Sequence, residues 1–251
     1  MAAARPLRHD SLMPLLDLKI EPQPDGRSCG VTCLHSVYAY YGKAVPMETL
    51  KREVEHLETG GTLAVMLGCD ALRRGFRARI YTYNLRLFDP TWFRDGVDLA
   101  YKLEYQARVK THARLKAATR RYLEFLKLGG HVRFREHTAR LIRAHLKRGK
   151  PLLVGLSSTY LYQTAREHGP RDDYDDVRGE PQGHFVVLCG YDKQEKHVSV
   201  ADPLLPNPMS GGSQYYNVSM DRLIAAIMLG IVTWDANLLL IEPALQPKAA
   251  A

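Results

Sequence analysis

A cysteine at the start of a helical pattern, with a glutamine shortly before it, is the feature of this sequence best suited to chemistry. The stretch EPQPDGRSCGVTCLHSVYAYYG carries Gln23 and Cys29. The thiolate is the reactive form of cysteine, and the free N–H groups and partial positive charge of a helix N-terminus favour it. Gln23 would donate its side-chain amide to an oxyanion formed at Cys29, and Gly30 would let a substrate backbone come close. The alternative is that Cys29 only packs in a core.

A histidine and an aspartate come together in a predicted hairpin later in the chain. The segments HFVVLCGYD and HVSVADP are separated by the polar turn DKQEK. A turn centred on residue 194 places position 184 opposite 204, and one centred on 193 places it opposite 202. In both registers His184 and Asp202 point to the same face of the period-two pattern. A histidine held by a carboxylate is fixed in one tautomer and accepts the proton of a thiol. The alternative is a core strand whose first residue happens to be polar.

Further residues are candidates for a substrate cleft. Gly183, Tyr160 and Tyr162 are the candidate substrate-binding residues. The acidic segment 167–180 contains six carboxylates against two arginines, which suits either a flap that receives a basic or amine-bearing substrate or a solvated loop. The histidines lack the spacing of metal ligands, and we expect neither a metal nor a cofactor.

The elements that would position these residues follow an α+β order. A helix is predicted from Cys29 to Tyr41 with Gly42 as its stop, because the apolar residues recur at helical spacing. A mostly helical stretch covers 86–149. The remaining predictions are helices at 46–58, 62–75 and 220–229, and strands at 76–85, 151–157, 184–192, 197–203, 213–219 and 237–243.

Composition and charge limit the class of protein. The 251 residues are 45% hydrophobic and carry a formal net charge of +8, which is typical of a soluble globular chain. No apolar run is long enough for a membrane span, and residues 1–20 lack a secretory pattern. The four scattered cysteines indicate reduced thiols and a cytoplasmic location.

Positive charge is concentrated between Lys102 and Lys150, where fifteen Lys or Arg residues stand against three acids. Such a segment binds an acidic partner or is simply a solvated face. Nucleic acid is not expected, because the sequence contains no recognised binding motif and no interleaved aromatic ladder.

Taken together, these motifs resemble cysteine peptidase family 39. The resemblance rests on Gln23, on Cys29-Gly30 and the following helix ending in YYG, on GGTLAVMLGCDALRRGFRA, on HFVV from His184, and on Ala201-Asp202-Pro203. This family contains papain-like domains best known for cutting double-glycine leader peptides in bacteriocin exporters. Stand-alone bacterial proteins carry the same pattern, and we expect this chain to be of the stand-alone type.

The resemblance implies a fold and a mechanism. It implies a single papain-like domain over 1–251, with a core at about 20–84 and 150–243 and a basic helical insertion at 86–149. Cys29 would be the nucleophile, His184 the general base and acid, Asp202 the orienting carboxylate and Gln23 the oxyanion donor. The implied activity is cleavage of a peptide or other amide bond through a thioester. The alternatives are acyl transfer to an amine on the same triad, or a binding protein that uses the basic segment.

Overall fold

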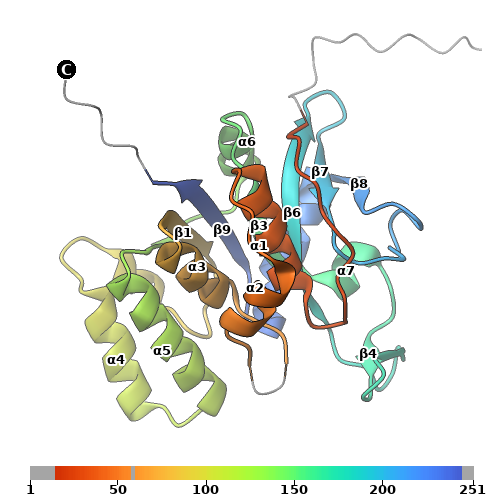
Figure 1. Cartoon of the computed structure of the whole chain (residues 1–251). Helices are drawn as coiled ribbons and strands as arrows, with labels where there is room; N and C mark the ends of the chain where they lie inside the picture. Colours follow the sequence, from red (N-terminus) through yellow and green to blue (C-terminus); the bar gives the residue numbers. More distant parts are fainter. Residues whose placement is uncertain (1–14, 58–59, 245–251) are drawn as a thin grey trace, which may run out of the picture.

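One mixed sheet organises the molecule (Figure 1). The computed structural model describes residues 15–57 and 60–244. Seven strands lie in the order β2-β1-β9-β3-β6-β7-β8, and all neighbours are antiparallel except β1 and β2. Their bounds are β1 Phe76–Thr82, β2 His131–Phe134, β3 Leu152–Ser157, β6 Gly183–Asp192, β7 His197–Ala201, β8 Tyr215–Ser219 and β9 Asn237–Pro243. Strands β4 (Glu167–His168) and β5 (Asp173–Tyr174) form a separate pair.

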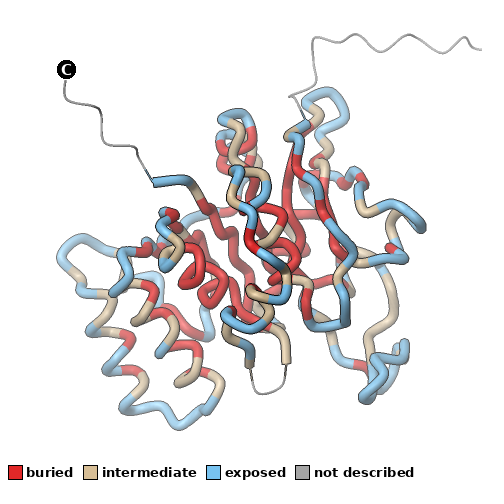
Figure 2. The backbone as a smooth tube through the Cα atoms, viewed as in Figure 1, coloured by how far each residue is buried: buried red, intermediate tan, exposed pale blue. Residues whose placement is uncertain are grey.

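Helices cover both faces of this sheet. Side chains of α1, α3, α4 and α5 form one hydrophobic cluster, and side chains of α6, α7 and α8 form the other. The bounds are α1 Cys29–Tyr40, α2 Met47–Glu53, α3 Ala64–Arg73, α4 Leu99–Val109, α5 Ala113–Lys127, α6 Ala139–Leu146, α7 Ser158–Tyr162 and α8 Met220–Leu229, with short 3-10 turns at Pro90–Phe93 and Gly230–Thr233. Figure 2 shows the burial concentrated in the sheet and in the helix faces turned to it.

Burial on both faces explains the apolar runs in the central strands. On β6, Val187 belongs to the α1–α5 cluster and Val186 to the α6–α8 cluster, so successive side chains enter opposite layers. β3 and β9 alternate in the same way. The predicted α+β class with a mostly antiparallel sheet is confirmed.

Most predicted elements occur where the sequence pattern indicated. Helix α8 and strand β9 have the expected bounds, and Gly42 follows α1 with a φ of 75°. Helix α2 is shorter than predicted, because Val54 already has extended backbone angles and is buried. The predicted end of that helix at Glu58 lies outside the described residues, as do residues 1–14 of the N-terminal stretch.

The segment 86–149 contains a strand that the helical prediction missed. Strand β2 adds to the sheet edge in parallel with β1, and its four residues are too few for a clear periodic signal. Phe125 of α5 and Leu103 of α4 are fully buried in the α1–α5 cluster, together with residues of α1 and α3. The segment therefore shares a core with its surroundings, and its status as an insertion remains a prediction.

No helix among residues 15–57 and 60–244 has the length and apolar character that a bilayer crossing requires.

Candidate active site

Cys29 is the first residue of α1 and is partly exposed. Ser28 occupies the N-cap position but its side chain makes no capping hydrogen bond. Helical bonding starts with Thr32 N–H, which donates to the Ser28 carbonyl at 2.9 Å. The N–H groups of the residues before Thr32 therefore have no helical acceptor, which is the usual condition of a helix N-terminus. They create a local preference for negative charge at Cys29.

His184 and Asp202 are hydrogen-bonded across the predicted hairpin. The register pairs Val187 with Ala201, and a bulge follows at Leu188. Continued to the strand end, this register makes His184 a diagonal neighbour of Asp202. The Nε2 atom of His184 lies 2.8 Å from Oδ1 of Asp202. A carboxylate only accepts hydrogen bonds, so the proton is on Nε2 and Nδ1 faces elsewhere.

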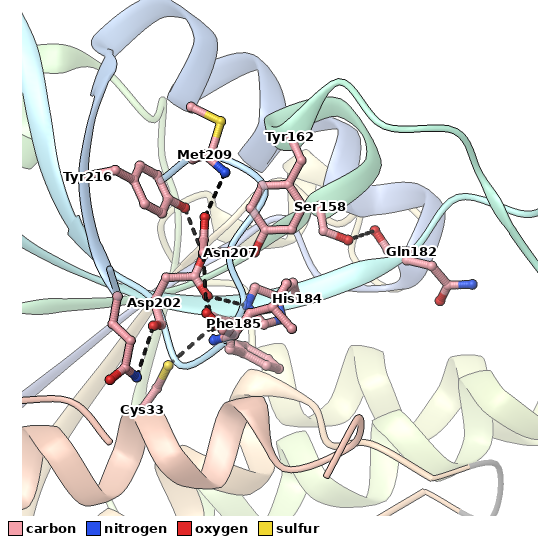
Figure 3. A network of polar contacts seen from close by, with 12 residues as sticks. Cys33, Ser158, Tyr162, Gln182, His184, Phe185, Asp202, Asn207, Met209 and Tyr216 are labelled. Atoms are coloured by element: carbon pink, nitrogen blue, oxygen red, sulfur yellow. Dashed lines mark hydrogen bonds and ion pairs between the residues drawn. The ribbon is translucent and has the colours of Figure 1, made fainter. Parts of the chain in front are cut away.

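Asp202 is the centre of a buried polar network (Figure 3). Its side chain is fully buried. Besides the bond from His184, Oδ1 accepts from Leu204 N–H at 3.0 Å. Oδ2 accepts from the hydroxyls of Tyr162 at 2.7 Å and Tyr216 at 2.8 Å. A buried carboxylate is tolerated only when its oxygens are satisfied in this way.

The network favours an ionised pair. Burial opposes the charged form of His184, but the charges of Asp202 and of Cys29 beside the imidazole, and hydrogen bonds to both, raise the pKa of His184 to about 10. Burial likewise opposes ionisation of Asp202, yet the His184 charge and the donated hydrogen bonds lower the Asp202 pKa below its ordinary value. An imidazolium held by a carboxylate stabilises a thiolate next to it.

The other cysteines are buried thiols. Burial raises the pKa of Cys33 well above its ordinary value, and raises those of Cys69 and Cys189 to about 12. Of the four cysteines, Cys29 is the one that is not buried.

Gln23 is connected to the end of the aspartate-bearing strand. Its backbone N–H donates to the Pro203 carbonyl at 2.8 Å. Its Oε1 is buried without a hydrogen-bond partner among the described residues, and Gln23 does not line the cavity at Cys29. Its place in an oxyanion hole therefore remains a prediction.

A cleft opens beside Cys29, with a cavity volume of about 460 Å³. Two segments far apart in sequence, the glycine-rich loop before α3 and the turn before β9, form its walls. Gly183 lines it, and its role in substrate binding remains a prediction. The other lining residues are Gly26, Arg27, Leu57, Gly60, Gly61, Thr62, Arg114, Asp172, Glu180, Pro181, Gln182, Phe185, Val232, Thr233 and Asp235.

Two predicted substrate-binding residues serve other contacts. Gly30 is buried, and a Cβ there would lie 2.5 Å from Thr62 Cγ2, so its lack of a side chain allows close packing instead of substrate approach. The Tyr162 hydroxyl donates its hydrogen bond to Asp202, and Tyr162 does not line the cleft. Tyr160 lies in a neighbouring cavity that shares Pro181 and Val232 with the cleft.

Sequence reasoning missed several residues of this region. Tyr216 occupies a buried position in the alternating pattern of a strand, which is typical of a core residue. Its hydroxyl group was the one sequence feature that indicated a polar partner. Arg114 comes from α5 in the basic segment and lines the cleft. Asp235 sits in the short turn before β9, where nothing in the local pattern separates it from an ordinary loop acid.

Comparison with known proteins decides the family. The sequence profile of the Peptidase_C39 like family matches residues 15–222, which is most of the chain. The chain belongs to the Peptidase_C39 like family. It is thus a cysteine peptidase-like hydrolase of the papain-like type, and the resemblance noted from the sequence motifs is confirmed.

One solved structure agrees with this family at the level of the fold, and two others are similar to smaller degrees. A protein described as a C39-like peptidase from Bacillus anthracis superposes on this C39-like peptidase with a TM-score of 0.51 at 14% identity, covering 92% of this chain and 98% of that one. The peptidase domain of Streptococcus ComA, a bifunctional ABC transporter, gives 0.42 at 18%, covering 90% and 98%. Xylellain, a cysteine protease from Xylella fastidiosa, gives 0.41 at 14%, covering 91% and 84%. No curated protein matches the chain.

Proposed function

We propose that this protein hydrolyses a peptide bond through a thioester on Cys29, with His184 as general base and acid and Asp202 as the orienting carboxylate. The observation that carries the proposal is the 2.8 Å hydrogen bond between His184 Nε2 and Asp202 Oδ1. Because that bond occupies Nε2, Nδ1 is the nitrogen left for Cys29. The partly exposed Cys29 lines an open cleft, and its charge acts on the His184 imidazole.

In the acylation step the Cys29 thiolate attacks the carbonyl carbon of the scissile amide. The C–N bond breaks as the His184 imidazolium gives its proton to the leaving nitrogen, and the acyl group stays on Sγ as a thioester. Water then attacks the thioester and passes a proton to neutral His184. The C–S bond breaks, which returns the thiolate and imidazolium.

The negative oxygen formed in each step needs hydrogen-bond donors. The backbone N–H of Cys29 at the helix N-terminus is one, and we assign the side-chain amide of Gln23 as the second. The hydrogen bond from Gln23 N–H to Pro203 supports this assignment, because it connects the Gln23 loop to the chain next to Asp202.

The test uses a cysteine-directed acylating probe followed by a peptide library. We expect labelling at Cys29, loss of labelling in Cys29→Ala, strong loss in His184→Ala, and retention in Cys189→Ala, which removes a buried thiol. Mass spectrometry of library products distinguishes hydrolysis from transfer to an added amine. A protein that cleaves no peptide and whose Cys29 reacts no faster than a buried cysteine would overturn the proposal.

A further inference from the structure

A carboxylate in the cleft has no ionic partner in the part of the chain that the structure describes. Asp235 lines the same cavity as Cys29 and is 6% exposed. Its Oδ1 accepts long hydrogen bonds from Ala64 N–H at 3.4 Å and Asn237 Nδ2 at 3.2 Å. Among the described residues, none donates to Oδ2, and no Lys, Arg or His nitrogen lies within 4.0 Å of the carboxylate.

This arrangement is unfavourable for the protein alone. A buried charge is costly unless it is paired and fully hydrogen-bonded. Burial raises the pKa of Asp235 to about 6, although Asn237, Ala64 and the charge of Arg114 act in the opposite direction. A cation that entered the cleft would supply the missing partner.

The two arginines that line the cleft are not paired with Asp235. The Arg114 guanidinium lies 5.4 Å from the centre of the Trp234 ring, and its Nη2 donates to the Thr233 carbonyl at 3.2 Å. The Arg27 side chain lies against Gly60, where an added Cβ would be 2.5 Å from Arg27 Cδ. Neither guanidinium forms an ion pair with Asp235 at 4.0 Å or less.

The acidic segment 167–180, called the acidic loop below, adds negative charge to the same cleft. Asp172 and Glu180 line the cavity together with Asp235, so three carboxylates face two guanidiniums. A cleft with an excess of carboxylates attracts cations and raises their local concentration.

We propose that this cleft contains a subsite for a cationic side chain of the peptide substrate, in which Asp235 forms the ion pair with a lysine or arginine of the peptide. The inference rests on the proposed peptidase function, because the subsite lies beside Cys29. It assigns a substrate class to the acidic loop as well, whose Asp172 and Glu180 form part of the wall.

Asp235 also has a structural contact that the test must separate from recognition. Its Oδ1 accepts from Ala64 N–H, at the N-terminus of α3, where no local side chain caps the helix. Asp235→Asn keeps an oxygen acceptor and removes the charge. Asp235→Ser, with a shorter oxygen acceptor, is the second variant if the first does not fold.

Binding is measured in the Cys29→Ala background, which requires no turnover. Fluorescent peptides carry one lysine, arginine, acetyl-lysine or norleucine, moved along a neutral scaffold. At one scaffold position we expect the lysine or arginine peptide to bind at least about tenfold more tightly than the acetyl-lysine peptide. A hydrogen bond to a buried charged group contributes enough binding free energy for a difference of that size. Asp235→Asn should bring this ratio close to one. The matched control is Asp173→Asn. Asp173 is an exposed acid of the acidic segment 167–180 that pairs with Arg171 and does not line the cavity, so this variant should keep the ratio.

Each other outcome has a defined meaning. Equal binding of lysine and acetyl-lysine peptides at every position overturns the subsite, while cleavage of those peptides by the unmodified protein would leave the proposed function standing. A ratio that persists in Asp235→Asn and Asp235→Ser also overturns it, and assigns recognition to the loop acids. Lysine-selective binding without any cleavage or Cys29 labelling would instead contradict the peptidase and keep the subsite.

Discussion

The thiol of Cys33 donates a hydrogen bond to the backbone carbonyl of Phe185, with 3.2 Å between sulfur and oxygen. Cys33 lies one helical turn beyond Cys29, and Phe185 directly follows His184. This contact therefore joins the helix of the proposed nucleophile to the strand of the proposed base. It also places the second cysteine of α1 in the core, away from the cleft.

Thiol reactivity should follow this difference. We expect iodoacetamide at about pH 7 to alkylate Cys29 at least about tenfold faster than Cys33, Cys69 or Cys189, because burial raises the pKa of the other three thiols and hides them from the reagent. Time-resolved peptide mapping by mass spectrometry measures the rates. A faster reaction at Cys69 or Cys189 would show that the nucleophile is misassigned.

The tyrosines on Asp202 should act as positioning residues. Tyr162→Phe and Tyr216→Phe each remove one donor to Oδ2, and a hydrogen bond to a charged group is worth about 1.5–3 kcal/mol. We expect each variant to lower kcat more than it raises KM, and to shift the pH profile of Cys29 alkylation, because the imidazolium loses support. The control is Tyr101→Phe, at an exposed tyrosine of α4 whose hydroxyl makes no hydrogen bond among the described residues. An unchanged pH profile in both test variants would show that these tyrosines contribute packing and do not position the Asp202 carboxylate.

Gln23 should separate alkylation from amide turnover. Alkylation by iodoacetamide forms no oxyanion, so Gln23→Ala should leave Cys29 reactive. Amide turnover should fall by about a hundred- to a thousandfold, as expected for loss of one oxyanion donor. Equal losses in the two assays would mean that Gln23 only holds its loop, for which its bond to Pro203 gives a ready explanation.

The helical segment should be needed for stability. Phe125 of α5 is fully buried, and its ring fills the space beside Gly68 of α3, where an added Cβ would lie 2.7 Å from Phe125 Cε2. Phe125→Ala should lower the free energy of unfolding by about 3–5 kcal/mol, whereas the control Leu128→Ala, at a residue 39% exposed, should have a small effect. Urea denaturation measures both. A cooperative, equally stable fold after replacement of 87–148 by a short linker would show instead that the segment is a dispensable insertion.

Asp235 should make the fold less stable above about pH 6. Its pKa is about 6 in the folded protein against an ordinary value of 3.8, so the folded state holds the proton more tightly than the unfolded chain. That contribution is fully present below about pH 4 and is lost as the pH rises through about 6, a loss of about 3 kcal/mol at 1.36 kcal/mol per pKa unit. Asp235→Asn should therefore be more stable than the unmodified protein at about pH 7.5 and closer to it at about pH 4. An advantage that is the same at both pH values would contradict the burial argument.

The sequence by itself determined the local features of this protein. Cys29 stands at a helix start because the apolar period begins there, and a hairpin turn centred on residue 193 or 194 would place His184 and Asp202 on the same face. Helix α8 has a helical apolar pattern and strand β9 is a continuous apolar run, so their bounds could be predicted from the chain alone. Each of these features depends on a single element or on two strands that follow each other in the chain.

Only the tertiary structure decided how these features meet. The register next to the turn pairs Tyr191 with Val198, and on its own it would put His184 and Asp202 on opposite faces of the hairpin. The bulge after Leu188 makes them diagonal neighbours on one face. The second oxygen of Asp202 receives Tyr162 and Tyr216 from two other elements, and Arg114 and Asp235 enter the cleft from segments more than a hundred residues apart. A sequence pattern indicates the period of one element but gives no information on the distance between elements. A buried carboxylate, however, is tolerated only if donors from other elements reach it. The pairing of such groups is therefore a property of the packed fold.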